Sequence, residues 1–544
     1  MARLQFLGVC ITLGFLAMVP SAVSQPANMD EWCPDPSPEV DEYRYLRSLS
    51  LDLRGTVPTV EEYAILEDEG EVPDSLIEEW LQGEAFLDRV AKNHRNLFWN
   101  NVSNFGFMGT PTAFRNTGGL LWRRDVAILY RGAVTDRDLD DDGINDIRAE
   151  APCKAEPAEW DENGDLIFED MGDGTFREGY VEVTDAFWDT TVPATTYYVC
   201  AADAQDQEVS ESGTACDSRS GWNDAGCGCG PNLRWCRYGT SEMPVRNSFG
   251  KQTDEKVKSI VREDQPYTDL FLDNTVHMNG PLAYFWKHQA QFSTTIRLTP
   301  KPVLEESIPD LGYADEDTWV AVPGTEEHAG VLTSAPFLIR FMSNRARANR
   351  FYNSFLCQPF QPPEDGLPAA DDASAVVLDL QKREGCKFCH STLEPVASHW
   401  GRWVEMGAGY LDAEEFPAFS ETCYDCAAAG TPCNALCREY YVTTALNDQE
   451  EPYLGWLKSY KFRRDDHQAN VEEGPRRLIE TTLTDGRFTN CTARTAAKWV
   501  LGREMDEFEE PWIAELESSF VDSEYSYREL IRAIVTSPVY RRVR

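Results

Sequence analysis

Two cysteines and a histidine in the C-terminal half of the chain form the pattern with the clearest chemistry. Cys386 and Cys389 are separated by two residues, and His390 follows directly. Two thiols at this spacing can add to the two vinyl groups of one haem as thioethers, and the adjacent imidazole then reaches the iron. The pattern predicts one covalent haem c with His390 as the proximal ligand. A thioredoxin-like dithiol is the alternative, but the flanks lack the strand–helix unit that accompanies it.

The second axial ligand of such a haem is left open by the sequence. Met406 lies far enough downstream to loop over the ring, and a thioether ligand would raise the reduction potential. His399 follows the proximal histidine closely, which places it on the same side of the ring. His328 and Met342 precede the motif in a region that should pack against it. Lone histidines and methionines more often fill a core or lie on the surface than bind iron. Of these four residues, Met406 is retained as the candidate for the distal ligand.

Covalent haem attachment requires export, and the first 24 residues have the features of a secretory signal. Arg3 supplies the positive end, residues 4–19 the apolar stretch, and residues 22–24 a small-residue cleavage site. The apolar run is short and ends at Pro20, which argues against a permanent membrane span. No later stretch is long and apolar enough to cross a bilayer. We therefore expect a periplasmic or secreted protein.

The charge balance restricts the possible partners. The 544-residue chain has 92 acidic and 50 basic residues, a formal net charge of −42. This balance argues against nucleic acid and anionic membranes as partners. It is consistent with solubility in a crowded or salty compartment, and also with docking to a basic redox partner protein.

Sixteen cysteines in an exported chain indicate disulfides. Setting aside Cys10 in the signal and the two haem cysteines leaves an odd number, so at least one thiol lies outside an intrachain bridge. Further expectations concern two groups of four cysteines. Cysteines 423, 426, 433 and 437 have spacing that suits zinc or two disulfides, and oxidising conditions favour disulfides. Cysteines 216, 227, 229 and 236 are expected to pair, with Cys153 or Cys200 among their partners.

An acidic loop resembles a calcium site. Its alternating oxygen donors would be the carboxylates of Asp138, Asp140, Asp142 and Asp146 and the carbonyl of Ile144, with Gly143 allowing a sharp turn. Position twelve is alanine, so the loop is less like an EF-hand than like the Asp-rich loops of secreted calcium-binding repeats. A solvated acidic loop is the alternative. Residues 161–165 are a weaker match and are expected to form a turn.

Hydrophobic periodicity and composition divide the chain into segments. Helical spacing is clear at residues 43–53, 75–80, 86–99, 269–289, 335–357, 476–483, 493–504 and 527–535, and extended runs occur at 180–183 and 195–199. The predicted segments are a signal peptide (1–24), a linker (25–39), a helical N-terminal domain (40–133), a Cys/Asp-rich insertion with the calcium loop (134–240), a helical connecting region (241–320), a cytochrome c-like haem-binding domain (321–408), a Cys-rich insertion (409–466) and a C-terminal helical domain (467–544).

Several stretches, in order, resemble planctomycete-type cytochrome c domain proteins. The similar stretches are residues 49–62, residues 329–333 leading to 355–359, the motif with Glu394-Pro395 and Gly401-Arg402-Trp403, residues 499–503 and residues 534–540. Glu394 replaces an aspartate and Ala397 a glycine of the family pattern, so the turn after the haem helix is expected to differ. The resemblance implies a haem and a fold but no substrate. Cys357 lies in the stretch 355–359, and Cys491 lies shortly before the stretch 499–503. A disulfide between these two cysteines is our hypothesis.

Together these features predict a mainly α fold: a helical N-terminal domain, an irregular Cys/Asp-rich insertion and an α-helical cytochrome c-like haem domain completed by C-terminal helices. The expected function is electron transfer by an exported mono-haem c-type cytochrome. A haem-containing periplasmic oxidoreductase acting on an organic substrate and a secreted calcium-stabilised binding protein are the alternatives. Motifs typical of serine hydrolases, zinc proteases and phosphate-binding loops are absent from the sequence.

Overall fold

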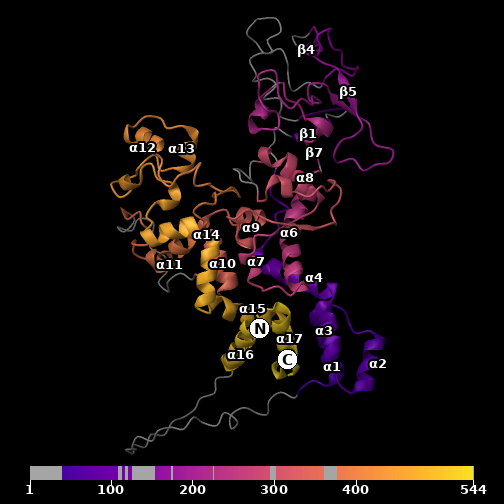
Figure 1. Cartoon of the computed structure of the whole chain (residues 1–544), viewed down its shortest axis with the longest axis vertical. Coiled ribbons are helices and arrows are strands. Elements are labelled where there is room, and N and C mark those ends of the chain that lie inside the picture. The colour runs from indigo at the N-terminus through magenta and orange to yellow at the C-terminus, as the bar shows by residue number, and fades with distance from the viewer. Residues whose placement is uncertain are drawn as a thin grey trace, which may run out of the picture.

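The computed structural model describes residues 39–107, 113–116, 120–124, 153–172, 176–224, 226–239, 241–293, 302–360 and 376–542. The molecule is elongated, with helices from both ends of the chain at one extremity and short strands at the other (Figure 1). As expected, the described part is mainly helical. Among its helices we find none with the length and apolar character that a membrane crossing requires.

Four helices form the N-terminal region: α1 (Glu42–Arg54), α2 (Val60–Glu69), α3 (Asp74–Gln82) and α4 (Glu84–Phe98). Gly55, with φ of 76°, ends α1 in the left-handed conformation that glycine adopts without a Cβ clash. Thr59 and Glu62 form a reciprocal capping box at the start of α2. The expected helices at 43–53, 75–80 and 86–99 correspond to α1, α3 and α4.

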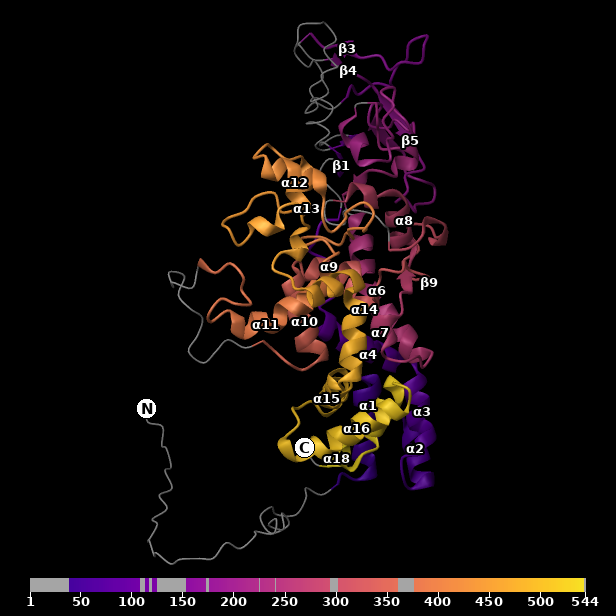
Figure 2. The ribbon, with the colours of Figure 1, turned by 60° about the vertical axis from the view of Figure 1, so that its left-hand side comes forward.

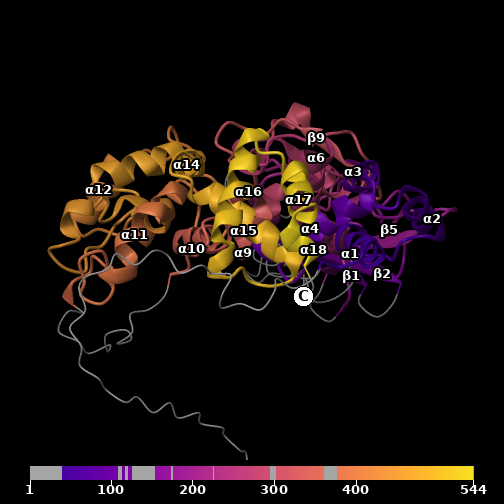
Figure 3. The same ribbon diagram turned by 90° about the horizontal axis from the view of Figure 1, so that it is seen from below.

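The two ends of the chain share one hydrophobic core. The C-terminal helices are α15 (Arg487–Leu501), α16 (Glu510–Asp522), α17 (Tyr527–Val535) and α18 (Pro538–Arg541), and they lie beside α1 and α3 (Figure 3). The hydroxyl of Tyr45 donates to the carbonyl of Val535 at 3.0 Å, and the hydroxyl of Tyr540 donates to Asp52 at 2.7 Å. Arg541 also pairs with Glu42. The terminal helices therefore form one structural unit.

The central helix α6 (Glu242–Arg262) joins this unit to the middle of the molecule, and its sequence pattern did not reveal it. Its buried face carries many polar side chains, which masks the apolar period: Glu242, Gln252, Thr253, Asp254 and Lys256. The region after it was expected to be one helix at 269–289. The structure instead has α7 (Asp269–Leu272), strand β8 (Val276–Met278), paired antiparallel with β9 (Val320–Val322), and α8 (Gly280–His288).

Short strands and three disulfides build the far end of the molecule. One sheet has the order β5-β6-β2-β1-β7, formed by Tyr180–Val183, Tyr197–Cys200, Leu121–Arg124, Ala113–Asn116 and Arg237–Tyr238. A two-stranded hairpin pairs β3 (Glu169–Asp170) with β4 (Phe176–Arg177). The disulfides join Cys153 to Cys200, Cys216 to Cys227 and Cys229 to Cys236. The last four cysteines were expected to involve Cys153 or Cys200; they pair among themselves because their own tight turns bring them together.

The segment that contains the Cys-Cys-His motif lies to one side of the long axis (Figure 2). It comprises α9 (Ala335–Arg340), α10 (Asn344–Phe355), α11 (Lys387–Ala397), α12 (Glu421–Ala428), α13 (Ala435–Tyr440) and α14 (Asp465–Thr484). Short 3-10 helices occur throughout the chain at Arg219–Asn223, Pro231–Leu233, Ala290–Phe292, Glu305–Ser307, Gly330–Thr333, Ser398–Trp400, Glu451–Tyr453, Lys458–Tyr460 and Glu507–Glu509. The Cys357–Cys491 disulfide, hypothesised above, ties the end of α10 to α15.

Candidate functional site

The motif residues lie at the start of α11 and share one face of it. Cys386 is the N-cap residue, and its carbonyl accepts hydrogen bonds from the backbone N–H groups of Cys389 at 3.2 Å and His390 at 3.0 Å. Positions three and four apart on a helix lie on the same face, so both thiols and the imidazole are neighbours. All three residues are partly exposed. In the described part of the chain, Cys386 and Cys389 are the only cysteines outside disulfides.

A carboxylate one turn further along α11 fixes the orientation of the imidazole. The Nδ1 atom of His390 lies 2.7 Å from Oε1 of Glu394. An ionised carboxylate can only accept hydrogen bonds, so Nδ1 carries the proton and donates it. The other ring nitrogen, Nε2, then presents its lone pair. This is the state that an imidazole needs to bind a metal, and metal-binding histidines usually donate their other N–H to such a partner.

Glu394 is itself held by two arginines from distant parts of the sequence. Its side chain is buried, and it accepts from Nε of Arg345 at 2.5 Å and from Nη1 of Arg463 at 3.1 Å. Arg463 also donates to the Glu394 carbonyl at 2.6 Å. Burial by itself would raise the pKa of Glu394, but the Arg345 hydrogen bond and the charges of both arginines lower this pKa overall. Glu394 is therefore ionised at neutral pH, and its contact with His390 is a charged one.

A buried arginine, which sequence reasoning missed, positions the helix against which α11 packs. Arg347 on α10 has no exposed surface and donates to five backbone carbonyls: those of Leu338, Phe341, Trp403, Val404 and Gly407. Burial lowers the pKa of its guanidinium to about 9. The arginine joins α10 to the chain that follows the motif helix. Nothing in the local sequence marks it, because its partners lie up to 60 residues away.

The structure brings two of the distal-ligand candidates together. The backbone N–H of Met406 donates to the carbonyl of Met342 at 2.7 Å, and both side chains are exposed. Met406 has a left-handed φ of 61°. Arg345, three residues after Met342, contacts the Glu394 carboxylate that holds His390. Both thioethers therefore belong to the neighbourhood of the motif, and Met406 remains a prediction as the distal ligand.

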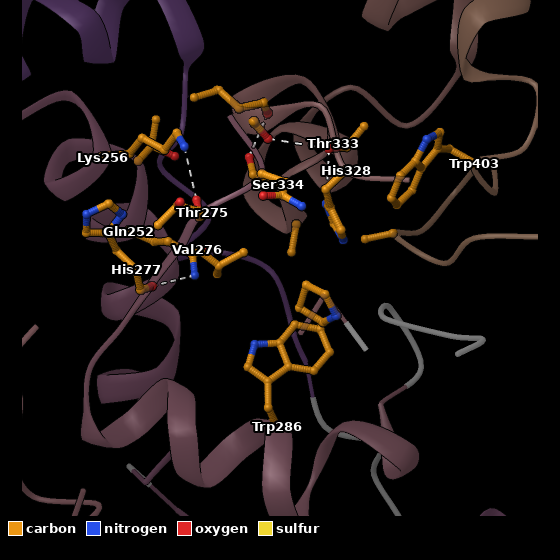
Figure 4. A pocket seen from close by; sticks show the side chains of 17 residues that line it. Gln252, Lys256, Thr275, Val276, His277, Trp286, His328, Thr333, Ser334 and Trp403 are labelled. Carbon is orange, nitrogen blue, oxygen red and sulfur yellow. Dashed lines mark hydrogen bonds between the residues drawn. The ribbon is translucent and has the colours of Figure 1, made fainter. Parts of the chain in front are cut away.

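The two histidine candidates are buried in other surroundings. The Nδ1–H group of His399 donates to the Gly474 carbonyl at 2.8 Å, and burial lowers the pKa of His399 to about 4. His328 contacts the Thr333 hydroxyl at 3.1 Å, and burial lowers its pKa to about 4 as well. Both are core residues. His328 also lines a small cavity of about 50 Å³ together with Trp286 and Trp403 (Figure 4).

The remaining cysteine cluster forms two disulfides rather than a zinc site. Cys423 pairs with Cys437 and Cys426 with Cys433, which leaves no thiolate for a metal. The pairing agrees with the favoured prediction. It links α12 to α13 and braces the Cys-rich insertion.

The predicted calcium ligands Asp138, Asp140, Asp142, Ile144 and Asp146 lie outside the described residues, as do Cys10, Cys33 and the signal segment. Within the described ranges, no group of three or more histidine, cysteine or acidic side chains could hold a metal ion. The weaker acidic match forms the expected turn: Oδ1 of Asp161 accepts from the backbone N–H groups of Asn163 at 2.8 Å and Asp165 at 2.9 Å. The calcium site therefore remains a prediction.

Comparison with known proteins gives one partial match. The model of a family described as a protein of unknown function (DUF1585) matches residues 473–540, which run from the second half of α14 to α18. This domain is found in cytochrome c-like multi-domain proteins. No curated protein and no solved structure matches the chain. The C-terminal helices of this chain are thus similar to the DUF1585 domain.

Proposed function

We propose that the protein is an exported, periplasmic or secreted mono-haem c-type cytochrome that acts in electron transfer, of the planctomycete-type cytochrome c domain class. The observation that carries the proposal is the hydrogen bond between His390 and Glu394 beside two cysteines that lie outside disulfides. Six disulfides elsewhere fit an oxidising compartment, where haem c is attached. The DUF1585 match supports the cytochrome c context.

Each residue of the site has a distinct role in this proposal. The Sγ atoms of Cys386 and Cys389 would hold the haem as thioethers, and Nε2 of His390 would bind its iron. Glu394 keeps the His390 proton on Nδ1 and prevents the ring from rotating. Bound haem would supply reversible one-electron chemistry.

The expected partner is a redox protein with a basic docking surface. The chain carries a formal net charge of −42, and opposite charge accelerates the encounter of two proteins. Such an association weakens at high ionic strength because salt screens exposed charges. The rate of electron exchange should therefore fall as salt is added.

A second function is favoured by a specific feature. A cavity of about 660 Å³ adjoins Glu394, the residue that holds His390. A cavity of this size can hold a small organic molecule. The haem would then accept electrons from a bound substrate, as in a periplasmic oxidoreductase. A secreted binding protein stabilised by calcium is a third reading, and it depends on the acidic loop at 138–146.

The test is to produce the full chain, with its signal, in cells with haem-attachment machinery. A haem stain on a denaturing gel and a pyridine haemochrome spectrum should both report covalent haem. Redox titration should then show reversible reduction, and the reduced spectrum should identify a methionine or histidine distal ligand. Absence of covalent haem would contradict the proposal. Reduction by sugars or alcohols without another donor would favour the oxidoreductase, and a haem that cannot be reduced would leave only a structural role.

A further inference from the structure

The 660 Å³ cavity lies between the motif helix and the disulfide-braced insertion. Its lining includes Glu394 and Ala397 of α11, residues 377–381 and 383 before the helix, and residues 457–459 and 461–463 of the insertion. The part of the lining that comes from the insertion is held to α13, because Nζ of Lys458 donates to the carbonyl of Arg438 at 2.8 Å. Arg438 lies on α13, which the Cys423–Cys437 disulfide joins to α12. The cavity is therefore bounded by rigid elements.

Charges around the cavity differ from those of the chain as a whole. Acidic residues outnumber basic ones almost two to one in the sequence, but the lining has five of each. Most of these charges already have partners. Arg345 and Arg463 pair with Glu394, and Lys461 pairs with Glu450 at 2.7 Å. The lining of the cavity is thus neutral in formal charge, whereas the chain as a whole is strongly negative.

One basic group of the lining has no partner. The guanidinium of Arg383 makes no hydrogen bond or ion pair with any described residue, and its Nε atom is shielded from solvent. The hydroxyl of Ser459, which also lines the cavity, is buried without a partner as well. Shielded polar groups are nearly always paired in folded proteins, because leaving one unpaired costs about 1–3 kcal/mol. The Nε–H group of Arg383 and the hydroxyl of Ser459 could therefore both donate hydrogen bonds to a bound ligand.

We propose that this cavity binds a carboxylate, with Arg383 as the anchor and Ser459 as a second donor. A guanidinium offers a planar pair of N–H donors that matches the two oxygens of a carboxylate. One uncommitted positive charge balances one negative charge, which favours a monocarboxylate over a phosphate. The carboxylate comes from one of two sources: a propionate of the haem, which rests on the proposed function, or a free organic acid, which does not.

The first arm of the test uses the unaltered chain made without haem-attachment machinery. Two monocarboxylates of different polarity, D-gluconate and hexanoate, are titrated calorimetrically against their neutral counterparts sorbitol and hexanol. We expect at least one carboxylate to bind and its counterpart not to. Arg383→Gln should weaken binding at least tenfold, and Arg383→Lys should weaken it less. Lys387→Gln is the matched control, because Lys387 is exposed, pairs with Glu384 and does not line the cavity. Far-ultraviolet circular dichroism checks that each variant is folded.

The second arm repeats these titrations on the haem-loaded protein and adds a redox titration. If a propionate occupies the cavity, added carboxylate no longer binds, and Arg383→Gln lowers the reduction potential because a cation near the haem is lost. If a free acid is the ligand, carboxylate binds both forms and the potential does not depend on Arg383. If neither carboxylate binds the haem-free chain and Arg383→Gln has no effect on the loaded one, the proposal is overturned. Tighter binding of inorganic phosphate than of either carboxylate also overturns it. Absence of covalent haem removes only the propionate source and leaves the first arm intact.

Discussion

Two helices of this protein begin with a pair of cysteines at the same spacing, and the two pairs have different fates. On α12, Cys423 is joined to Cys437 of α13, and Cys426 is joined to Cys433, which lies just before α13. On α11, Cys386 and Cys389 are joined neither to each other nor to another described cysteine. The spacing is identical, so it does not decide the chemistry.

The neighbouring elements decide it. The α12 thiols pair with Cys437 on the short helix α13 and with Cys433 in the segment just before it, so both thiols are consumed. The partner of α11 is α10, which contributes Arg345 to the Glu394 network instead of a thiol. Only the α11 pair is followed by a histidine, and only there does a buried carboxylate orient the imidazole. Mutations that exchange or remove these neighbours test the comparison.

The largest expected effect is complete loss of covalent haem. Cys386→Ser with Cys389→Ser removes both thioether positions, so a haem stain on a denaturing gel should be negative. The control is Cys426→Ser with Cys433→Ser, which opens the bridge between α12 and the segment before α13 and should leave the stain unchanged. Loss of the stain in the α12 variant would show that the two pairs are not independent.

The next largest effect is expected from the residue that holds α10 in place. Arg347→Met leaves five buried carbonyl groups without a donor, and we expect it to lower the free energy of unfolding by about 4 kcal/mol. Urea denaturation measures the change. Arg44→Met, at an exposed arginine, should cost less than about 0.5 kcal/mol. Equal costs for both variants would mean that Arg347 does not support the site.

The disulfides of α12 and α13 should contribute stability without affecting the haem. Cys423→Ala with Cys437→Ala opens a bridge between residues 14 positions apart, and the expected loss is about 3 kcal/mol. Urea denaturation measures this loss, and the pyridine haemochrome assay measures haem content. A fall in haem content of the folded protein would contradict the separation of the two regions.

The smallest effect is expected at the carboxylate that distinguishes α11. Glu394→Gln removes a negative charge from the hydrogen bond to His390, which destabilises oxidised iron. We expect the reduction potential to rise by about 59 mV, a tenfold change in the one-electron equilibrium. Glu394→Asp keeps the charge and should shift the potential less. Glu384→Gln, at an exposed carboxylate paired with Lys387, is the control for charge alone and should have little effect.

The sequence was sufficient for features that depend on neighbouring residues. Helices α1, α3, α4, α15 and α17 and the preference for disulfides in the 423–437 cluster follow from local patterns. The Cys357–Cys491 bridge followed from the family resemblance. The motif itself is local, and so is the four-residue spacing between His390 and Glu394.

Features built from distant residues were not predictable. Arg345 and Arg463 contact Glu394 from 49 and 69 positions away in the sequence, and no local pattern indicates these contacts. Helix α6 was missed because polar side chains occupy its buried face. The expected helix at 269–289 is interrupted because β8 pairs with β9, more than 40 residues further along the chain. In each case, tertiary contacts replaced the local preference.

The core shared by the two ends of the chain has a consequence for how this protein is made. The face of α1 that carries Tyr45 is covered by residues around Val535, 490 positions later. Contacts at such separation form slowly, because the intervening chain must close a very long loop. The first helices therefore cannot finish folding until the last ones have been synthesised. A ribosome that stops early releases a product with an uncovered apolar face, which proteases can recognise before a haem is ever attached.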